Sequence, residues 1–337
     1  MLREANLRTT LLGFAGALVV LGVVVWVLGV GRLVSALGRA SLPILGLVAV
    51  AAAVWLCAWG LSLRTVLGAL GGPVSRVVAV GVFAAATFAN NVTPFGQAGG
   101  EPVSALFISR AASTEYETGL AAIASVDSLN FVPSIALALV GLGYFGATLA
   151  FGRRLVLATA AVGALAVAIP VAGYLGWRYR YRVEAGVVQV LTPVVRALGR
   201  LLPRRSPTDH DVIRRRIEGF FHAIERITND RAALALALAY SGLGWLALGC
   251  SLWLSLYALG YATPFAAVLV VVPVGAIAGI TPLPGGLGGV ETVLIALLVP
   301  TTGVPAAAAG AAVLIHRAAT YWLPTALGGG VAATIRG

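Results

Sequence analysis

The sequence has few charged residues and no lysine. Charged side chains make up 10% of the 337 residues, hydrophobic residues make up 59%, and the mean hydropathy is +0.96. Because soluble domains carry about 25% charged residues, this composition excludes a soluble protein and predicts an integral membrane protein. All 23 basic residues are arginine, which we attribute to the base composition of the genome rather than to a mechanism.

Residues that build disulfides, metal sites and catalytic centres are also scarce. The two cysteines, Cys57 and Cys250, lie in apolar stretches without metal-ligand spacing, so the sequence predicts neither a disulfide framework nor a metal site. There is no P-loop, so we expect no ATP-driven pumping by this chain alone and no cofactor. Asp209 and Asp211, on either side of His210, are the nearest approach to a catalytic cluster and are more typical of a helix start. We therefore expect no enzyme and assign no catalytic residue.

The net charge of +11 raises the question of a nucleic-acid partner. Twelve of the 23 arginines fall between Arg178 and Arg231, which is how the positive-inside rule distributes basic residues in a cytoplasmic loop. Attraction to anionic lipids of the inner leaflet explains the charge more simply than binding to DNA or RNA. We expect a multi-pass protein of the cell (plasma) membrane, with both termini cytoplasmic and no nucleic-acid partner.

Six apolar runs are long enough to cross about 30 Å of hydrocarbon. The first is too long for the apolar core of a signal peptide, so we expect it to be a retained span. The six runs are Leu11 to Val30, Leu42 to Leu61, Gly119 to Gly141, Leu155 to Trp177, Ala232 to Leu259, and Ala306 to about Ile335 with a kink at Pro324.

One motif occurs twice in the chain. Residues 93–101 read TPFGQAGGE and residues 281–291 read TPLPGGLGGVE, so each copy begins with Thr-Pro, contains Gly-Gly and ends in a carboxylate, Glu101 or Glu291. A proline follows each carboxylate at almost the same distance along the chain, Pro133 in the first half and Pro324 in the second. The sequence therefore predicts a single membrane domain, 1–337, made of two repeats, 1–150 and 155–337, with an Arg-rich connector, 178–231.

Each motif lies between two apolar arms that are too short to make two full crossings. The arms are Val77 to Ala89 with Val103 to Ser109, and Ala262 to Ile280 with Thr292 to Val299. We interpret both segments as re-entrant hairpins, because a single crossing at the first one would move the Arg-rich connector to the outside. Three spans and one hairpin in each repeat give an all-α fold with inverted topology, in which the hairpins open on opposite sides. This arrangement is typical of transporters, whose substrate site lies between the repeats.

Irregular backbone at membrane depth must be buried in protein or line a water-filled cavity. The sequence therefore predicts a polar cavity at the two motifs. We expect the second arm of each hairpin to begin at the motif's carboxylate, with Pro102 at the first helical position. The predicted hairpin backbone consists of Pro94, Gly96, Gly99, Gly100, Pro282, Pro284, Gly285, Gly286, Gly288 and Gly289.

Two interpretations of Glu101 and Glu291 remain open from the sequence. The carboxylates either cap the positive end of a half-helix, or face the cavity and bind a cationic headgroup, a proton or a counter-ion. Asp127 follows the first glutamate at the same distance along the chain as Arg317 follows the second, so an acid and a base occupy equivalent places in the repeats. We expect Asp127 or Glu291 to be the partner of Arg317. The other candidate substrate-contacting residues are Asn90, Asn91, Thr93, Asn130, Thr281 and Tyr321.

Two further features have a simpler structural explanation. His316 is more typical of a packing or hydrogen-bonding residue than of a titrating one. The segment Asp209 to Asp230 repeats isoleucine and phenylalanine at helical spacing, which predicts an amphipathic helix that lies on the inner leaflet and connects the repeats.

The second motif, together with Arg317 and the run Tyr321-Trp322-Leu323-Pro324, resembles the second-half signature of the lysylphosphatidylglycerol synthase transmembrane-region family, also called flippase-like proteins. The first motif is similar to the first-half signature of that family, and the resemblance covers essentially the whole chain. It implies a relative of the lipid-flipping half of bacterial lysyl-lipid exporters, without their soluble aminoacyl-transfer domain.

The resemblance favours a lipid translocase that moves a polar headgroup between the repeats. The implied partners are a phospholipid, aminoacyl lipid or polyprenyl-phosphate-linked lipid, anionic inner-leaflet lipids, and a separately encoded glycosyltransferase. Two alternatives remain open: a membrane component or enzyme of lipid-linked sugar or phosphate metabolism, and an ion-coupled small-solute transporter.

Overall fold

Helices joined by short turns make up the residues that the computed structural model of the protein describes, which are 2–93, 96–148, 178, 222–223, 225–281 and 283–336. No strand occurs among them, and several of the helices are long and apolar enough to cross a membrane. The prediction of an all-α membrane protein is therefore confirmed.

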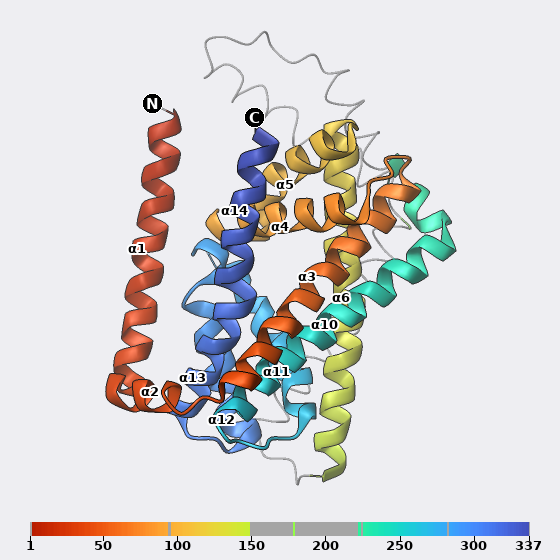
Figure 1. Ribbon diagram of the computed structural model, residues 1–337. Helices are drawn as coiled ribbons and strands as arrows, with labels where there is room; N and C mark the ends of the chain where they lie inside the picture. Colours follow the sequence, from red (N-terminus) through yellow and green to blue (C-terminus); the bar gives the residue numbers. More distant parts are fainter. Residues whose placement is uncertain are drawn as a thin grey trace.

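The first part of the chain forms six helices, and the second of them turns sharply away from the first. At Gly29, whose φ of 85° is readily adopted only by glycine, the chain bends by 87°. The short helix after the bend lies across the lower end of the molecule in Figure 1. The helices are α1 (Leu2–Leu28), α2 (Val30–Leu37), α3 (Leu42–Ala69), α4 (Arg76–Val92), α5 (Gln97–Ala112) and α6 (Tyr116–Thr148).

The later part of the chain alternates long helices with short irregular turns. A π-helical segment directly precedes Leu323 and Pro324, so the helix is irregular close to the predicted kink. The elements are α10 (Arg231–Ala258), α11 (Phe265–Ile277), η1 (Ala278–Ile280), η2 (Pro284–Gly286), α12 (Gly289–Thr302), α13 (Ala306–Arg317), η3 (Ala318–Trp322) and α14 (Leu323–Arg336).

Within the described residues, four helical segments are long and apolar enough to span a bilayer: Leu42–Ala69, Tyr116–Phe145, Arg231–Ala258 and Pro284–Thr302. The bent pair Gly13–Leu28 and Val30–Leu37 is a fifth candidate if it is taken as one span. The first three match predicted full spans. The fourth contains the expected second arm of the second hairpin, whereas α4 and α11 are shorter apolar helices of 17 and 13 residues. The predicted last span is divided into α13, η3 and α14, and the predicted span Leu155 to Trp177 lies outside the described residues.

The helices recur along the chain at a nearly constant offset. Helices α3 and α10 both have 28 residues, and the offset between their first residues equals the offset between those of α4 and α11. The offsets from α5 to α12, from α6 to α13, and from Glu101 to Glu291 are almost the same. The internal repeat seen in the sequence therefore extends to the order and spacing of the helices. The first residues of the four pairs are Leu42 and Arg231, Arg76 and Phe265, Gln97 and Gly289, and Tyr116 and Ala306.

Helices α3 and α10 lie side by side and run in opposite directions (Figure 1). The Trp59 indole N–H donates to the carbonyl oxygen of Ser241 at 3.2 Å, and the Ser62 hydroxyl donates to that of Ala237 at 3.2 Å. A later residue of α3 thus contacts an earlier residue of α10, so the two helices are antiparallel. Trp59 also packs edge-on against Trp245 with ring centroids 5.6 Å apart. The largest buried cluster of apolar side chains surrounds this contact.

The predicted start of the second arm in the first hairpin is wrong. Helix α5 begins at Gln97, four residues before Glu101, and Pro102 lies inside the helix instead of at its first position. The chain turns earlier because Gly96 adopts a φ of 55°. Gly100 then lies in the helix, where a Cβ would overlap the side-chain oxygen of Asn90. Glycine is needed at this position for close packing of the two arms, not for a turn.

Most of the predicted connector 178–231 lies outside the described residues, but its last turns are described. Ile227, which belongs to the predicted apolar stripe, is buried in the main cluster together with Ala223. The Arg226 guanidinium donates to the carbonyl oxygen of Leu70 at 3.4 Å, at the C-terminal end of α3. The end of the connector is therefore packed on the helical bundle.

Replacing Gly244 by alanine is expected to destabilise the α3–α10 contact. A Cβ at this position would overlap Nε1 of Trp59, and overpacking of this kind costs about 1–3 kcal/mol. We expect a lower temperature of thermal unfolding in detergent, followed by tryptophan fluorescence. Gly68→Ala is the control, since a Cβ there meets nothing within 4 Å. Equal unfolding temperatures for the two variants would contradict the packing argument.

Candidate functional site

Inside the helical bundle, each motif lies against the residues that directly precede the other motif. A Cβ on Gly96 of the first motif would lie 3.0 Å from the carbonyl oxygen of Gly279, just before the second motif. A Cβ on Gly285 of the second motif would lie 3.0 Å from Cα of Asn91, just before the first. The glycines at these positions therefore allow the two irregular segments to approach at backbone distance.

Three residues of the second motif have a positive φ, a backbone conformation that favours glycine. Gly285, Gly286 and Gly288 have φ values of 55°, 69° and 82°. Helix α12 then begins at Gly289, and Glu291 is its third residue. The Glu291 Oε2 atom accepts a hydrogen bond from the Gly288 N–H at 2.6 Å, so the carboxylate caps the helix, as one of the two interpretations predicts.

The same carboxylate also forms a buried ion pair. Oε1 of Glu291 lies 2.6 Å from Nε of Arg317, and the two side chains are 2% and 13% exposed. Arg317 further donates from Nη2 to the carbonyl oxygen of Gly285 at 3.3 Å. The prediction that Asp127 or Glu291 is the partner of Arg317 is confirmed for Glu291. Both carboxylate oxygens accept from a fixed donor, which compensates for the burial of the charge.

Tyr321 connects the last helices to both motifs. Cζ of the Arg317 guanidinium lies over the Tyr321 ring, 4.5 Å from the ring centroid, and Tyr321 is 1% exposed. Its hydroxyl donates to the carbonyl oxygen of Asn91 at 3.0 Å, close to the first motif. Asn91 in turn donates from Nδ2 to the Thr325 hydroxyl at 2.7 Å. Tyr321 is therefore a buried bridge between the repeats, whereas its neighbour Trp322 is 48% exposed.

The equivalent place in the first repeat holds two acids in place of an ion pair. By the offset between the repeats, Glu101 and Asp127 correspond to Glu291 and Arg317. Asp127 lies within electrostatic reach of Glu101, and its Oδ2 atom is buried without a hydrogen-bond partner. Glu101 forms no ion pair with any of the described residues and does not cap α5, since it is the fifth residue of that helix. The capping interpretation is thus confirmed for Glu291 and wrong for Glu101.

The remaining polar candidates have mainly structural contacts. Asn130 is buried between α6 and α10, where its Oδ1 accepts from the Ser241 hydroxyl and its carbonyl oxygen accepts from Trp245 at 2.9 Å. Thr93 donates to the carbonyl oxygen of Ala89 at 2.8 Å at the end of α4. The Thr281 hydroxyl is buried without a partner in the part of the chain that is described. Asn90 packs against Gly100, and Pro94 and Pro282 lie outside the described residues.

The expectation for His316 agrees with its surroundings. His316 is 4% exposed and its Nδ1 lies 2.9 Å from the Ser251 hydroxyl, so it is a packing and hydrogen-bonding residue. Cys57 and Cys250 are both free thiols. No group of three or more metal-ligating side chains occurs in the described part of the chain.

Sequence reasoning missed Thr325, whose hydroxyl holds the side chain of Asn91. A weak signal for it exists: a hydroxyl residue directly follows the repeated proline in both halves, as Ser134 after Pro133 and as Thr325 after Pro324. Gly279, which lies against Gly96, was also missed because it precedes the motif by two residues.

A profile of the family described as lysylphosphatidylglycerol synthase TM region matches residues 11–328 of the chain, a range that contains both motifs and all the site residues. The chain belongs to this family. A UPF0104 membrane protein of Pyrococcus horikoshii is 26% identical over 316 residues, which is 91% of each chain. A UPF0104 membrane protein of Methanothermobacter thermautotrophicus is 26% identical over 330 residues, or 96% of this chain and 92% of the relative. The family membership predicted from the two motifs is confirmed.

Glutamine at position 291 is expected to destabilise the protein, whereas glutamine at position 101 is not. Both oxygens of Glu291 accept hydrogen bonds, so Glu291→Gln turns an amide NH2 toward the donor of Gly288 or Arg317 and leaves a buried group unpaired, at a cost of about 1–3 kcal/mol. Glu101 has no such bonds among the described residues. Thermal unfolding of both variants in the same detergent tests the contrast, and equal unfolding temperatures would disprove it.

Proposed function

We propose that this chain is a lipid translocase, in which a polar lipid headgroup crosses the bilayer between two inverted repeats. The observation that supports this most directly is the close approach of the two glycine motifs beside four ionisable groups, Glu101, Asp127, Glu291 and Arg317. Ionisable side chains inside a membrane are costly and usually mark a transport pathway. Irregular backbone between repeats is where transporters of this architecture bind their substrates.

The inverted arrangement proposed here has support from the antiparallel pair α3 and α10. These helices occupy equivalent places in the repeat series, yet they run in opposite directions. The helix pair α4 and α5 lies toward one end of the molecule and the pair α11 and α12 toward the other (Figure 1). Both features agree with two re-entrant hairpins that open on opposite sides.

We further propose that the end that holds both termini faces the cytoplasm. Both termini lie at the upper end of Figure 1. Arg110 contacts the carbonyl oxygen of Ile335 near the C-terminus, and Arg226 contacts the end of α3, so several arginines gather toward this end. Arg32 and Arg39 lie on or next to α2, at the other end. The proposed location is the plasma membrane, in agreement with the positive-inside rule.

The cargo we propose is a lipid whose headgroup includes a cationic group. The second repeat neutralises its own glutamate through Arg317, whereas Glu101 and Asp127 of the first repeat have no cation beside them in the described part of the chain. An amino group of the headgroup would supply the missing charge. The description of the family, which names a lysyl-lipid synthase, agrees with this class of lipid. We propose no covalent chemistry for the chain itself.

A headgroup-accessibility assay tests the proposal. Phosphatidylcholine vesicles with reconstituted protein would hold a trace of NBD-labelled lysyl-phosphatidylglycerol, phosphatidylglycerol or polyprenyl phosphate, and dithionite would bleach the exposed label. With the wild-type protein, we expect dithionite to bleach more label than the outer leaflet alone contains. The excess should be largest for lysyl-phosphatidylglycerol. Glu101→Gln and Asp127→Asn should each reduce the rate about tenfold or more, because a charge-assisted contact is lost.

The matched control is Glu115→Gln, which removes the same charge at an exposed position between α5 and α6. Position 101 is preferable to position 291 for this test, since the change at 291 also removes structural hydrogen bonds. Bleaching no faster than in protein-free vesicles for all three lipids, or full activity of both acid variants, would contradict the proposed function.

A further inference from the structure

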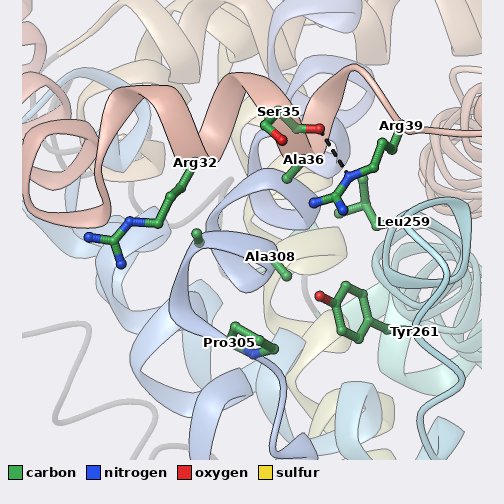
Figure 2. Close-up of a pocket in the computed structure, with 9 residues that line it drawn as sticks. Arg32, Ser35, Ala36, Arg39, Leu259, Tyr261, Pro305 and Ala308 are labelled. Atoms are coloured by element: carbon green, nitrogen blue, oxygen red, sulfur yellow. Dashed lines mark hydrogen bonds between the residues drawn. The ribbon is translucent and has the colours of Figure 1, made fainter.

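A cavity of about 330 Å³ opens at the end of the molecule opposite the two termini. Three segments enclose it: α2 with the residues after it, the turn before α11, and the turn before α13. Figure 2 shows α2 above the cavity and the two turns below it. Its polar or shape-defining residues are Arg32, Ser35, Arg39, Tyr261, Pro305 and Ala308.

The sequence of α2 explains why its polar side chains reach this cavity. Leu33 is buried and packs with Ala311 of α13, and this anchors one face of the short helix. Arg32 and Ser35 are three residues apart on α2, and Arg39 lies in the turn that follows the helix, where its Nε donates to the carbonyl oxygen of Ser35. Because the chain bends by 87° before α2, the helix lies across the bundle end, at the level of lipid headgroups if α1 spans the bilayer.

The cavity presents positive charge without a negative partner. Neither Arg32 nor Arg39 has a carboxylate within 4 Å among the described residues. The Arg39 Nε donates to the carbonyl oxygen of Ser35 at 3.2 Å, which turns the guanidinium back toward the cavity and leaves its Nη donors available (Figure 2). The Tyr261 hydroxyl lies on the opposite wall. The Arg39 guanidinium with nearby hydroxyls matches the geometry of a phosphate, whereas Arg32 lies at the edge of the cavity with its guanidinium beside Gly29 and adds positive charge there.

We propose that this cavity binds the phosphate of an anionic phospholipid headgroup. A lipid is favoured over a soluble anion because α2 lies across the end of the bundle, where headgroups would meet it. A zwitterionic lipid would bring its own cation toward the two arginines, so the net anionic class fits best. Tyr261 precedes α11 and Pro305 follows α12, so the bound lipid would sit at the open end of the helix pair that bears the second motif. This site does not depend on the proposed translocation.

Native mass spectrometry of the delipidated protein in detergent measures this binding directly. Phosphatidylglycerol and phosphatidylcholine with identical acyl chains would be titrated separately. We expect the wild-type protein to prefer phosphatidylglycerol, and the double variant Arg32→Gln, Arg39→Gln to bind it about tenfold more weakly, since two interfacial charges are lost. Tyr261→Phe should give a smaller loss.

The matched control is the double variant Arg76→Gln, Arg110→Gln, which removes two exposed arginines toward the terminal end. We expect it to bind phosphatidylglycerol as the wild-type protein does. Equal losses in the two double variants, or no loss in the first, would overturn the proposal. Competition by inorganic phosphate at the concentration of the lipid would overturn the assignment to a lipid. An unchanged unfolding temperature of each variant confirms that the fold is intact.

Discussion

Backbone that leaves the helical path inside a bilayer must find its hydrogen-bond partners within the protein, and in this chain side chains supply them. Arg317 donates to the carbonyl oxygen of Gly285, Glu291 accepts from the N–H of Gly288, and Tyr321 donates to the carbonyl oxygen of Asn91. Arg317 directly precedes a π-helical segment and Tyr321 lies within it, a local geometry that often accompanies functional sites. The shape of both motifs therefore depends on one short stretch of the last helices.

The two motif-bearing halves of the chain have similarly spaced helices but different charges at equivalent positions. In the second repeat a glutamate meets an arginine, and in the first repeat the equivalent positions are both acidic. Breaking a buried ion pair leaves an uncompensated charge, so the second repeat is held in one arrangement by its own residues. The acids of the first repeat have no such internal partner in the described part of the chain. Equivalent positions after the two motifs thus carry different charges, which agrees with the proposed transport of a charged headgroup.

Local patterns in the sequence were enough to predict several features. Hydropathy predicted α3, α6 and α10, and the repeated Thr-Pro and Gly-Gly-Glu pattern predicted where the irregular segments lie. The sequence left Asp127 and Glu291 as the two candidate partners of Arg317, and the ion pair forms with Glu291. Long-range packing determined the rest. The start of α5 at Gln97 depends on Gly96 and on contact between the two arms, and Asn130 is held by a residue far away in the sequence, on α10. No periodicity in the sequence encodes such partners.

The positions of the hydrogen bonds also determine which contacts break if the two repeats rotate against each other in the proposed translocation. The bonds among Glu291, Arg317, Gly285 and Gly288 all lie within the second repeat, so a rigid rotation of one repeat against the other leaves them intact. The bonds of Asn91 with Tyr321 and Thr325 join the two halves of the chain, as do the bonds of Trp59, Ser62 and Asn130 with α10, and such a rotation must break those that cross the moving surface. Alternating access in inverted-repeat transporters consists largely of that kind of motion. The ion pair would then preserve the shape of the second motif, while neutral hydrogen bonds between the halves, individually worth only about 0.5–1.5 kcal/mol, form and break during the cycle.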